Sequence, residues 1–326
     1  MRDLRALPKA ELHLHLVGAM RPATLAEFAA AAGRSAPDPR GFTNFAEFQV
    51  VYRAAFGLAH ARLENLLRLV REIVADAAAD GVVWVQPHFD PHGFPDLGPP
   101  DELLEQVLAA GQDQGARLGV GFGLTLAAVR DDGPEAAVAL ARFGARHAGD
   151  GVHALGLVGD EAAVGGDRFA VAFAIARDAG LTSAPHAGEL AGPASVRTAV
   201  EVLGATRIAH GVRSAEDPAV TALLAESGVS LDVSLSSNRM LGVFPELARH
   251  PLPQLLAAGV RCSLGADDPL MFGAGLLDEY RIARAELGLT DGQLAELART
   301  SLATSDAPAA LIAAGNADID RWLGAN

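Results

Sequence analysis

Four short motifs in the chain contain side chains that bind metals or transfer protons. They read Glu11-Leu12-His13-Leu14-His15, Pro185-His186-Ala187-Gly188-Glu189, Ile208-Ala209-His210-Gly211 and Leu264-Gly265-Ala266-Asp267-Asp268-Pro269. Each motif comes at the end of a short apolar run, where a buried strand is expected to give way to a loop. Barrel enzymes carry their catalytic side chains at such strand ends, so the motifs predict one active site built from distant parts of the chain.

The histidine pair of the first motif suggests a metal site. His13 and His15 are two residues apart on a predicted strand, so both side chains leave the same face. The pair alone is weak evidence, because polar residues at a strand end produce the same pattern. In a closed barrel the first and last strands are neighbours, which brings Asp267 beside the pair and leaves His186 across the mouth. Three imidazoles and one carboxylate suit a single zinc ion with one position open for water, so we expect mononuclear zinc at these four residues.

Three further residues of the motifs could handle protons or substrate. Glu189 follows His186 by three residues and could reach both the substrate and the water, or it could be a charge in the first turn of the next helix. His210 could orient the water and help to deprotonate it, or it could be a core histidine. Asp268 could accept a hydrogen bond from substrate, support the metal ligands, or cap the chain before Pro269.

The elements between the motifs alternate between strand and helix. Buried strands are predicted at residues 11–16, 82–89, 118–126, 152–158, 181–186, 207–210, 229–233 and 260–264. Helical periodicity is found at residues 60–79, 100–118, 134–148, 167–179, 193–203, 216–227 and 290–302. This alternation favours an α/β fold of the (β/α)8 TIM-type barrel. A doubly wound open sheet is the alternative, but its phosphate-binding turn is missing after the first strand.

One segment fits neither element type and is predicted to be an insertion. Residues 34–60 are first rich in proline and then carry the aromatic residues Phe42, Phe45, Phe48, Tyr52 and Phe56. We interpret them as a lid over the mouth of the barrel. No linker or repeat divides the rest, so residues 1–326 are predicted to form one domain.

Composition excludes several classes of function. The chain has 326 residues and a net charge of -14, which argues against nucleic-acid and anionic-membrane partners. Its one cysteine, Cys262, permits no disulfide framework, and no signal peptide or transmembrane-length run is evident, so a cytoplasmic location is expected. Its one lysine, Lys9, precedes the first strand, which argues against a carboxylated lysine between two metals and against Schiff-base chemistry.

Taken together, the motifs resemble the adenosine deaminase family of the amidohydrolase superfamily. The resemblance rests on residues 7–16, Gly159-Asp160-Glu161, residues 186–189, His210-Gly211 and residues 263–269, which occur in the family's order over nearly the whole chain. It implies a distorted barrel with one zinc and hydrolytic release of ammonia from a 6-aminopurine nucleoside. It also implies that Glu189 protonates purine N1, that His210 orients the attacking hydroxide, that Asp268 contacts the hydroxide and N7, and that the Gly159 backbone contacts N3. The aromatic segment at residues 42–56 matches the family's mobile lid by position.

One departure from the family pattern bears on the substrate. After the second metal histidine, adenosine deaminases carry Asp, which holds the ribose 5′-hydroxyl, and adenine deaminases carry Glu, whereas this chain has Val17. With Val17 at this position the chain resembles the aminodeoxyfutalosine deaminases, whose substrate has an apolar 5′ extension ending in a carboxylate. The alternatives are an adenosine or adenine deaminase proper, another zinc hydrolase on the same barrel, or a non-catalytic relative. A smaller departure is Ser234-Leu235-Ser236-Ser237-Asn238, where relatives often have Cys-Pro before the Asn.

Overall fold

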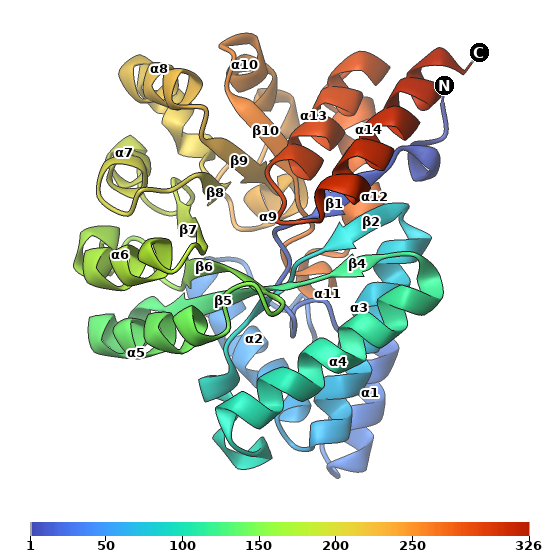
Figure 1. The fold of residues 1–326 in the computed structure, drawn as a ribbon, viewed down its shortest axis with the longest axis vertical. Helices are drawn as coiled ribbons and strands as arrows, with labels where there is room; N and C mark the ends of the chain where they lie inside the picture. Colours follow the sequence, from blue (N-terminus) through green and yellow to red (C-terminus); the bar gives the residue numbers. More distant parts are fainter. Residues whose placement is uncertain (1, 326) are drawn as a thin grey trace.

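The strands of this chain are short and parallel, and they stand side by side at the centre of the molecule (Figure 1). The computed structural model describes residues 2–325. Its strands are β1 (Lys9–Glu11), β2 (Val82–Val85), β3 (His88–Phe89), β4 (Gly121–Phe122), β5 (Leu124–Val129), β6 (Val152–Val158), β7 (Thr182–Ala187), β8 (Arg207–His210), β9 (Ser230–Val233) and β10 (Arg261–Leu264). Most of their residues are buried, as expected for a parallel sheet that is covered on both faces.

Backbone pairing closes these strands into a ring. One sheet has the order β1-β2-β4, and the other has the order β10-β9-β8-β7-β6-β5-β3. Because β3 continues β2 and β5 continues β4 after short breaks, the ten strands within residues 2–325 occupy eight positions. Parallel bridges join Leu14 to Asp267 and His15 to His88, which connects the first strand to a neighbour on each side. The predicted (β/α)8 barrel is therefore confirmed.

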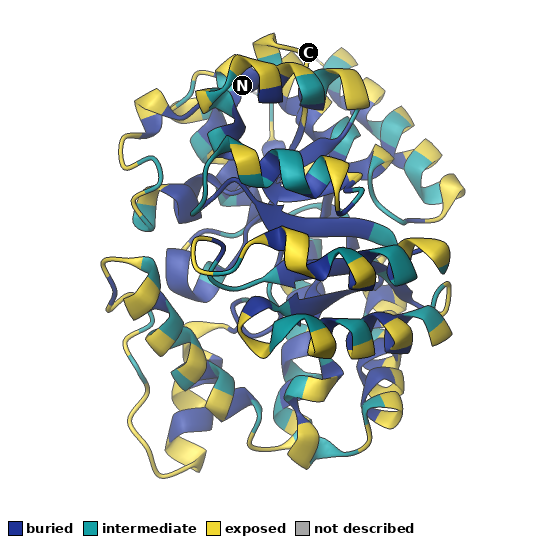
Figure 2. Cartoon of the chain, turned by 90° about the vertical axis from the view of Figure 1, so that its left-hand side faces the viewer, coloured by how far each residue is buried: buried dark blue, intermediate teal, exposed yellow. Residues whose placement is uncertain are grey.

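Helices surround the ring of strands. Those predicted from periodicity are α3 (Leu63–Ala79), α4 (Pro100–Leu118), α5 (Gly133–Arg146), α6 (Ala170–Asp178), α7 (Pro193–Glu201), α8 (Pro218–Ser227) and α13 (Asp291–Ala303). In α3 the buried residues Leu66, Val70, Ile73 and Ala77 recur at helical spacing and form one apolar face. Figure 2 shows this two-sided pattern across the molecule, with buried surfaces toward the strands and exposed surfaces outward.

Several helices are not predicted by the sequence patterns. They are α1 (Pro22–Ala31), α9 (Leu235–Met240), α10 (Leu252–Ala257), α11 (Pro269–Phe272), α12 (Leu276–Ala285) and α14 (Ala309–Gly324). In α14 the buried residues Gly315, Ile319 and Trp322 recur at helical spacing, a periodicity that the sequence analysis did not use. No helix within residues 2–325 is both long and apolar enough to cross a membrane.

Three predicted strands differ from the observed ones. The first ends at Glu11, so His13 and His15 lie just beyond the regular strand rather than on it. The second is broken between β2 and β3, where Pro87 has no N–H to give to a ladder. The third starts at Gly121 rather than at residue 118, because α4 continues through Leu118 and ends where Gly119 adopts a left-handed φ of 73°.

The segment predicted to be a lid contains the helix α2 (Phe45–Ala59). Asn44 caps it, since its side chain accepts a hydrogen bond from the Glu47 N–H at 3.1 Å. The Phe48 ring packs 5.5 Å from the rings of both Phe42 and Phe272, which ties the helix to α11. That residues 1–326 form one domain in which this segment acts as a lid stays a prediction.

Candidate active site

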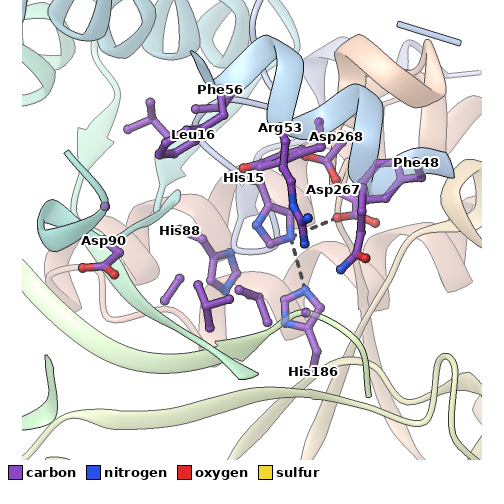
Figure 3. A pocket seen from close by; sticks show the side chains of 18 of the residues that line it. His15, Leu16, Phe48, Arg53, Phe56, His88, Asp90, His186, Asp267 and Asp268 are labelled. Atoms are coloured by element: carbon purple, nitrogen blue, oxygen red, sulfur yellow. Dashed lines mark hydrogen bonds and ion pairs between the residues drawn. The ribbon is translucent and has the colours of Figure 1, made fainter. Parts of the chain in front are cut away.

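The motif residues meet around one cavity of about 390 Å³ at the carboxyl ends of the strands (Figure 3). The residues singled out in the sequence that line this cavity are His15, Val17, Gly159, His186, Glu189, His210, Asp267 and Asp268. His13 is fully buried beneath them, with its ring 4.8 Å from that of His186 and 4.5 Å from that of His210. The structure therefore brings together every residue that the sequence motifs singled out.

Four side chains converge on one point at the base of the cavity. The Nε2 atom of His186 lies 3.1 Å from Nε2 of His13 and 3.2 Å from Nε2 of His15. The Oδ1 atom of Asp267 lies 3.4 Å from Nε2 of His13 and 3.1 Å from Nε2 of His15. Two ligand atoms bound tetrahedrally to zinc lie about 3.4 Å apart, because each bond is about 2.0–2.1 Å long. These four distances thus fit donors that share one small metal ion, and Asp267 belongs both to the cluster of His13 and His186 and to the cluster of His15.

The hydrogen bond behind His13 fixes which of its nitrogens faces this point. Its Nδ1 atom lies 3.0 Å from the carbonyl oxygen of Asp232, which can only accept, so Nδ1 carries the proton. The Nε2 lone pair of a neutral His13 therefore points at Nε2 of His186. Two ring nitrogens at this distance need a cation or a proton between them, and a metal ion satisfies both. Hydrogen-bonded carbonyls commonly orient metal-binding histidines in this way.

His210 belongs to the same cluster but faces another side of it. One ligand atom each from His13, His186, His210 and Asp267 lies within 4.8 Å of the others, so distance alone also allows His210 as a ligand. However, Nε2 of His210 faces Oδ2 of Asp267 at 3.8 Å and Oε2 of Glu189 at 3.4 Å, not the oxygen shared by His13 and His15. His210 and Asp267 both have left-handed backbones, with φ of 65° and 60°. Such strain in residues other than glycine is concentrated at functional sites.

Burial and neighbouring charges act in opposite directions in this cluster: burial alone would lower the pKa of His13, but the Asp267 carboxylate outweighs it and raises that pKa. Burial lowers the pKa of His186 well below the usual imidazole value, and repulsion from protonated His13 and His15 would lower it further. Burial also lowers the pKa of His210, to about 3. Burial alone would raise the pKa of Asp267, but the imidazoles of His13 and His15 outweigh it and hold that pKa well below its usual range. Neutral imidazoles and an ionised carboxylate are the forms that bind a metal.

The loop after β7 holds Glu189 in a defined position. Burial raises the pKa of Glu189 well above its usual value, and the negative charges of Asp267 and Glu161 raise it further, so its carboxyl group tends to keep a proton. Glu161 anchors the loop through its two oxygens. Oε2 accepts the N–H groups of residues 189, 190 and 191 at 3.0, 2.9 and 3.0 Å, and Oε1 accepts the Gly188 N–H at 2.5 Å and the Ser195 hydroxyl.

Asp268 occupies space that a neighbouring glycine leaves open. A side chain on Gly18 would overlap the carboxylate of Asp268, so Gly18 is required for this arrangement. Burial raises the pKa of Asp268 well above its usual value. Its Oδ1 atom is buried and has no hydrogen-bond partner among the residues that the structure describes, and Asp268 itself lines the cavity. An unpaired buried oxygen beside a cavity is available to a ligand.

Two supporting residues were not predicted from the sequence. The His88 ring stacks on that of His15 at 4.9 Å, and its Nδ1 lies 3.3 Å from the Leu14 carbonyl oxygen. Arg130 donates from Nη2 to the carbonyl oxygen of His186 at 2.7 Å. His88 lies near the end of a predicted strand, as the other site histidines do. This position was the one sequence feature that could have indicated its place at the site. Nothing in the spacing of Arg130 indicates its contact with His186.

Comparison with known proteins agrees with this geometry. The profile of the adenosine deaminase family matches residues 8–314. This chain belongs to the adenosine deaminase family. The deaminase is 43% identical to a putative adenosine/adenine deaminase of Streptomyces coelicolor, over 99% of this chain and 98% of the relative. It is 36% identical to the aminodeoxyfutalosine deaminase of Acidothermus cellulolyticus, over 88% of this chain and 85% of the relative.

Solved structures show the same fold in other deaminases. The adenine deaminase of Arthrobacter aurescens superimposes with a TM-score of 0.90 and 28% identity, over 98% of this chain and 99% of that chain. An amidohydrolase of Burkholderia ambifaria with bound Zn superimposes with a TM-score of 0.86 and 25% identity, over 98% of this chain and 93% of that chain. The deaminase is therefore a hydrolytic enzyme of a metal-dependent family, and its His and Asp cluster is able to hold a metal.

The anchoring of the loop by Glu161 can be tested by Glu161→Gln. The amide keeps the size of the side chain but leaves one oxygen to accept the N–H groups that two oxygens now share, so Glu189 should shift. We expect kcat to fall about a hundredfold, the cost of roughly 1 Å of misplacement, with metal content unchanged. Asp160→Asn is the matched control, because Asp160 accepts only from the N–H groups of the adjacent turn, Ala162 and Ala163. Equal kcat in the two variants would contradict the role of Glu161.

Proposed function

We propose that this deaminase holds one zinc ion through His13, His15, His186 and Asp267. The observation that carries the proposal is that His186 Nε2 and Asp267 Oδ1 each lie 3.1–3.4 Å from Nε2 of both His13 and His15, at the base of a buried cavity. The similar amidohydrolase with bound Zn supports zinc as the metal. When bound, zinc lowers the pKa of a coordinated water towards about 7 and so supplies a nucleophile at neutral pH.

The reaction that we propose is hydrolytic removal of the 6-amino group from a purine. Glu189 is the proton donor to purine N1, since its buried and negatively surrounded carboxyl keeps a proton. Protonation of N1 makes C6 more open to attack by water, and ammonia leaves. Burial raises the pKa of Asp268 and so favours a protonated carboxyl group, which would donate a hydrogen bond to purine N7 from its unpaired oxygen. Gly159 has a left-handed φ of 100° and presents its backbone to the cavity, where it would contact N3. His210 orients the attacking water.

The wall of the cavity bears on the substrate. Val17 is 2% exposed and lines the cavity, where it offers no hydrogen bond to a ribose 5′-hydroxyl. Phenylalanines 45, 48, 56, 89 and 94 add further apolar surface. We infer that the preferred substrate is an adenosine with an apolar 5′ group, and aminodeoxyfutalosine is the first candidate. The similarity to an aminodeoxyfutalosine deaminase supports it. The similar adenine deaminase and the putative adenosine/adenine deaminase keep adenine and adenosine as the second candidates.

Arg53 could receive a carboxylate at the end of such a group. It is the one arginine among the described residues that line the cavity. It comes from α2, and its side chain is 69% exposed and lies 3.5 Å from Asp131. An exposed ion pair of this kind contributes only about 0–1 kcal/mol. A substrate carboxylate could therefore replace Asp131 at little cost.

The zinc proposal predicts one equivalent of zinc for each chain of the purified enzyme. Removal of the metal with a chelator should abolish deamination, and one equivalent of zinc should restore it. His186→Ala should bind the metal more weakly than wild type, because it removes one of the four proposed donors. Measurement of two equivalents, or full activity without metal, would refute the proposed site.

The proton-donor role predicts the behaviour of Glu189→Gln. The amide keeps the shape of the side chain but has no acidic proton, and general acid–base catalysis contributes about 100- to 10,000-fold. We expect kcat to fall by at least this factor while zinc stays bound. Glu201→Gln, an exposed position on α7, is the control for the substitution itself. A Glu189→Gln enzyme with a near wild-type rate would rule out this role.

The substrate proposal predicts a preference that Val17→Asp reverses. A buried, unpaired hydroxyl costs about 1–3 kcal/mol, so kcat/KM for adenosine should be roughly ten to a hundred times lower than for an adenosine with an apolar 5′ group. The carboxylate in Val17→Asp should move the ratio back towards adenosine. Val17→Leu is the matched control, since it changes the size of the side chain by a similar amount without adding a hydrogen-bonding group. If wild type prefers adenosine, or if the ratio does not move, Val17 does not select the substrate.

A further inference from the structure

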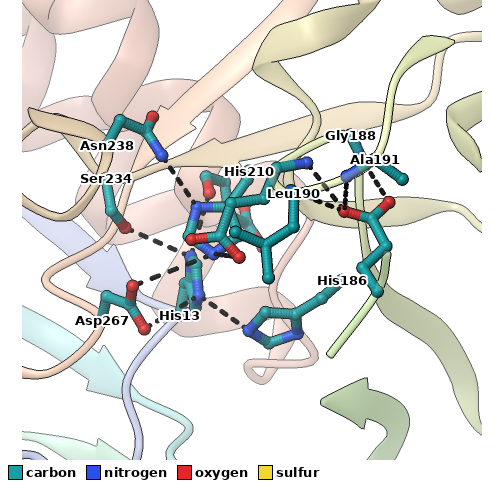
Figure 4. Close-up of polar contacts among 12 residues, drawn as sticks. His13, His186, Gly188, Leu190, Ala191, His210, Ser234, Asn238 and Asp267 are labelled. Atoms are coloured by element: carbon teal, nitrogen blue, oxygen red, sulfur yellow. Dashed lines mark hydrogen bonds and ion pairs between the residues drawn. The ribbon is translucent and has the colours of Figure 1, made fainter. Parts of the chain in front are cut away.

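A chain of buried hydrogen bonds runs from a helix terminus to His210. The N–H of Leu252, at the start of α10, donates to Nδ1 of His250 at 3.2 Å. Nε2 of His250 lies 3.1 Å from Oδ1 of Asn238, and Nδ2 of Asn238 lies 3.3 Å from Nδ1 of His210. The three side chains are buried, with exposed fractions of 4% or less. Figure 4 shows the last link, in which the Asn238 amide points at the His210 ring.

The direction of each hydrogen bond follows from the first donor. A main-chain N–H can only donate, so Nδ1 of His250 is unprotonated and the ring carries its proton on Nε2. That proton is donated to Oδ1 of Asn238, which turns the NH₂ group of the amide toward His210. Nδ1 of His210 must then accept, so the one proton of the His210 ring is on Nε2. Burial also lowers the pKa of His250 to about 4, which agrees with a neutral ring.

The main chain holds Asn238 in place for this task. Asn238 lies on α9, which begins directly after Ser234. The carboxylate of Glu279 accepts the N–H groups of Leu235 at 2.7 Å and Ser236 at 3.2 Å, which are the first two residues of α9. The N–H of Asn238 itself donates to the Ser234 carbonyl at 3.0 Å. A helix of six residues has little stability of its own, so these contacts set the position of the amide.

We propose that Asn238 and His250 are positioning residues that hold His210 in its Nε2–H tautomer, so that His210 presents an N–H group to the cavity. In this tautomer Nε2 cannot bind a metal, which separates His210 from the four proposed ligands. The N–H faces Glu189 Oε2 at 3.4 Å and Asp267 Oδ2 at 3.8 Å. It is therefore placed to donate a hydrogen bond to the oxygen of the attacking water, and it cannot take up that water's proton. The roles of His210 toward the metal and the attacking water rest on the proposed function, whereas the tautomer itself does not.

The tautomer can be read directly by NMR of the metal-loaded enzyme labelled with ¹⁵N-histidine. The chain has 10 histidines, and a His210→Gln spectrum identifies the His210 signals by their absence. Wild type should show a protonated Nε2 and an unprotonated Nδ1. In Asn238→Asp the carboxylate can only accept, so the proton should move to Nδ1. We expect kcat to fall by up to about 10,000-fold, the loss that a wrong histidine tautomer causes in a catalytic triad, with metal content unchanged.

His250→Gln separates the effect of the hydrogen-bond chain from Leu252 to His210, here called the relay, from a general structural effect. The glutamine keeps an acceptor for Leu252 and a donor for Asn238, so His210 should stay in the Nε2–H form and most of the wild-type kcat should remain. His250→Leu removes both groups and should yield a mixture of tautomers and a lower kcat. These variants also test the relay if Asn238→Asp does not fold.

Two outcomes would overturn the proposal. One is a wild-type His210 that carries its proton on Nδ1, and the other is an Asn238→Asp enzyme whose His210 tautomer is unchanged. The relay and the proposed function can fail separately. An Nε2–H tautomer that responds to Asn238→Asp, in an enzyme that deaminates no 6-aminopurine, would support the relay and refute the function.

Discussion

The pairing of the first strand with the last is the contact on which the rest of this structure depends. The Asp267 N–H donates to the His13 carbonyl at 2.8 Å, and the His15 N–H donates to the Asp267 carbonyl at 2.9 Å. The residues that close the barrel are thus the residues that meet at the proposed metal site. Glu11 reinforces the closure, since its carboxylate accepts the N–H groups of His13 and Ala266 at 3.2 Å each. The ring cannot open without separating the donors.

Burial is the second influence on the site, because it shifts the pKa of several groups that touch the cavity. It lowers the pKa of His186 and His210 and raises the pKa of Glu189. Groups held in unusual protonation states require fixed partners, and here these are main-chain atoms and buried ions. Behind His13, for example, Asp232 forms an ion pair at 2.9 Å with Arg207, and both side chains are nearly inaccessible to solvent. Breaking such a buried pair usually costs about 3–5 kcal/mol.

The base and the wall of the cavity serve different purposes. The base is made of strand ends, which the ladder holds rigidly, and it carries the groups for the chemistry. The wall is made of Val17, α2 and loops, which can change without disturbing the ladder. A family of barrels can therefore keep one reaction and vary the substrate. The polarity of residue 17, which we propose selects the substrate, would be a small change of this kind, since it would alter one hydrogen bond and leave the base of the cavity as it is.

The sequence by itself determined the type of fold and the residues of the site. Apolar runs and helical periodicity predicted the alternation of strands and helices, and the motifs at strand ends predicted His13, His15, His186, Glu189, His210, Asp267 and Asp268. These signals are local, since they come from residue type and spacing within a few positions. The helices α9, α10 and α11 gave no such signal, because six residues or fewer are too short to show a helical period.

Only the tertiary structure decided how these residues work together. The contact between Arg130 and the His186 carbonyl joins residues 56 positions apart, and the link from Asn238 to His210 spans 28. The anchoring of the Glu189 loop by Glu161 spans 28 as well. No local pattern predicts which donor faces which acceptor across such separations. The tautomer of His210 and the proton on Glu189 depend on those directions and on burial, and both exist only once the barrel is closed.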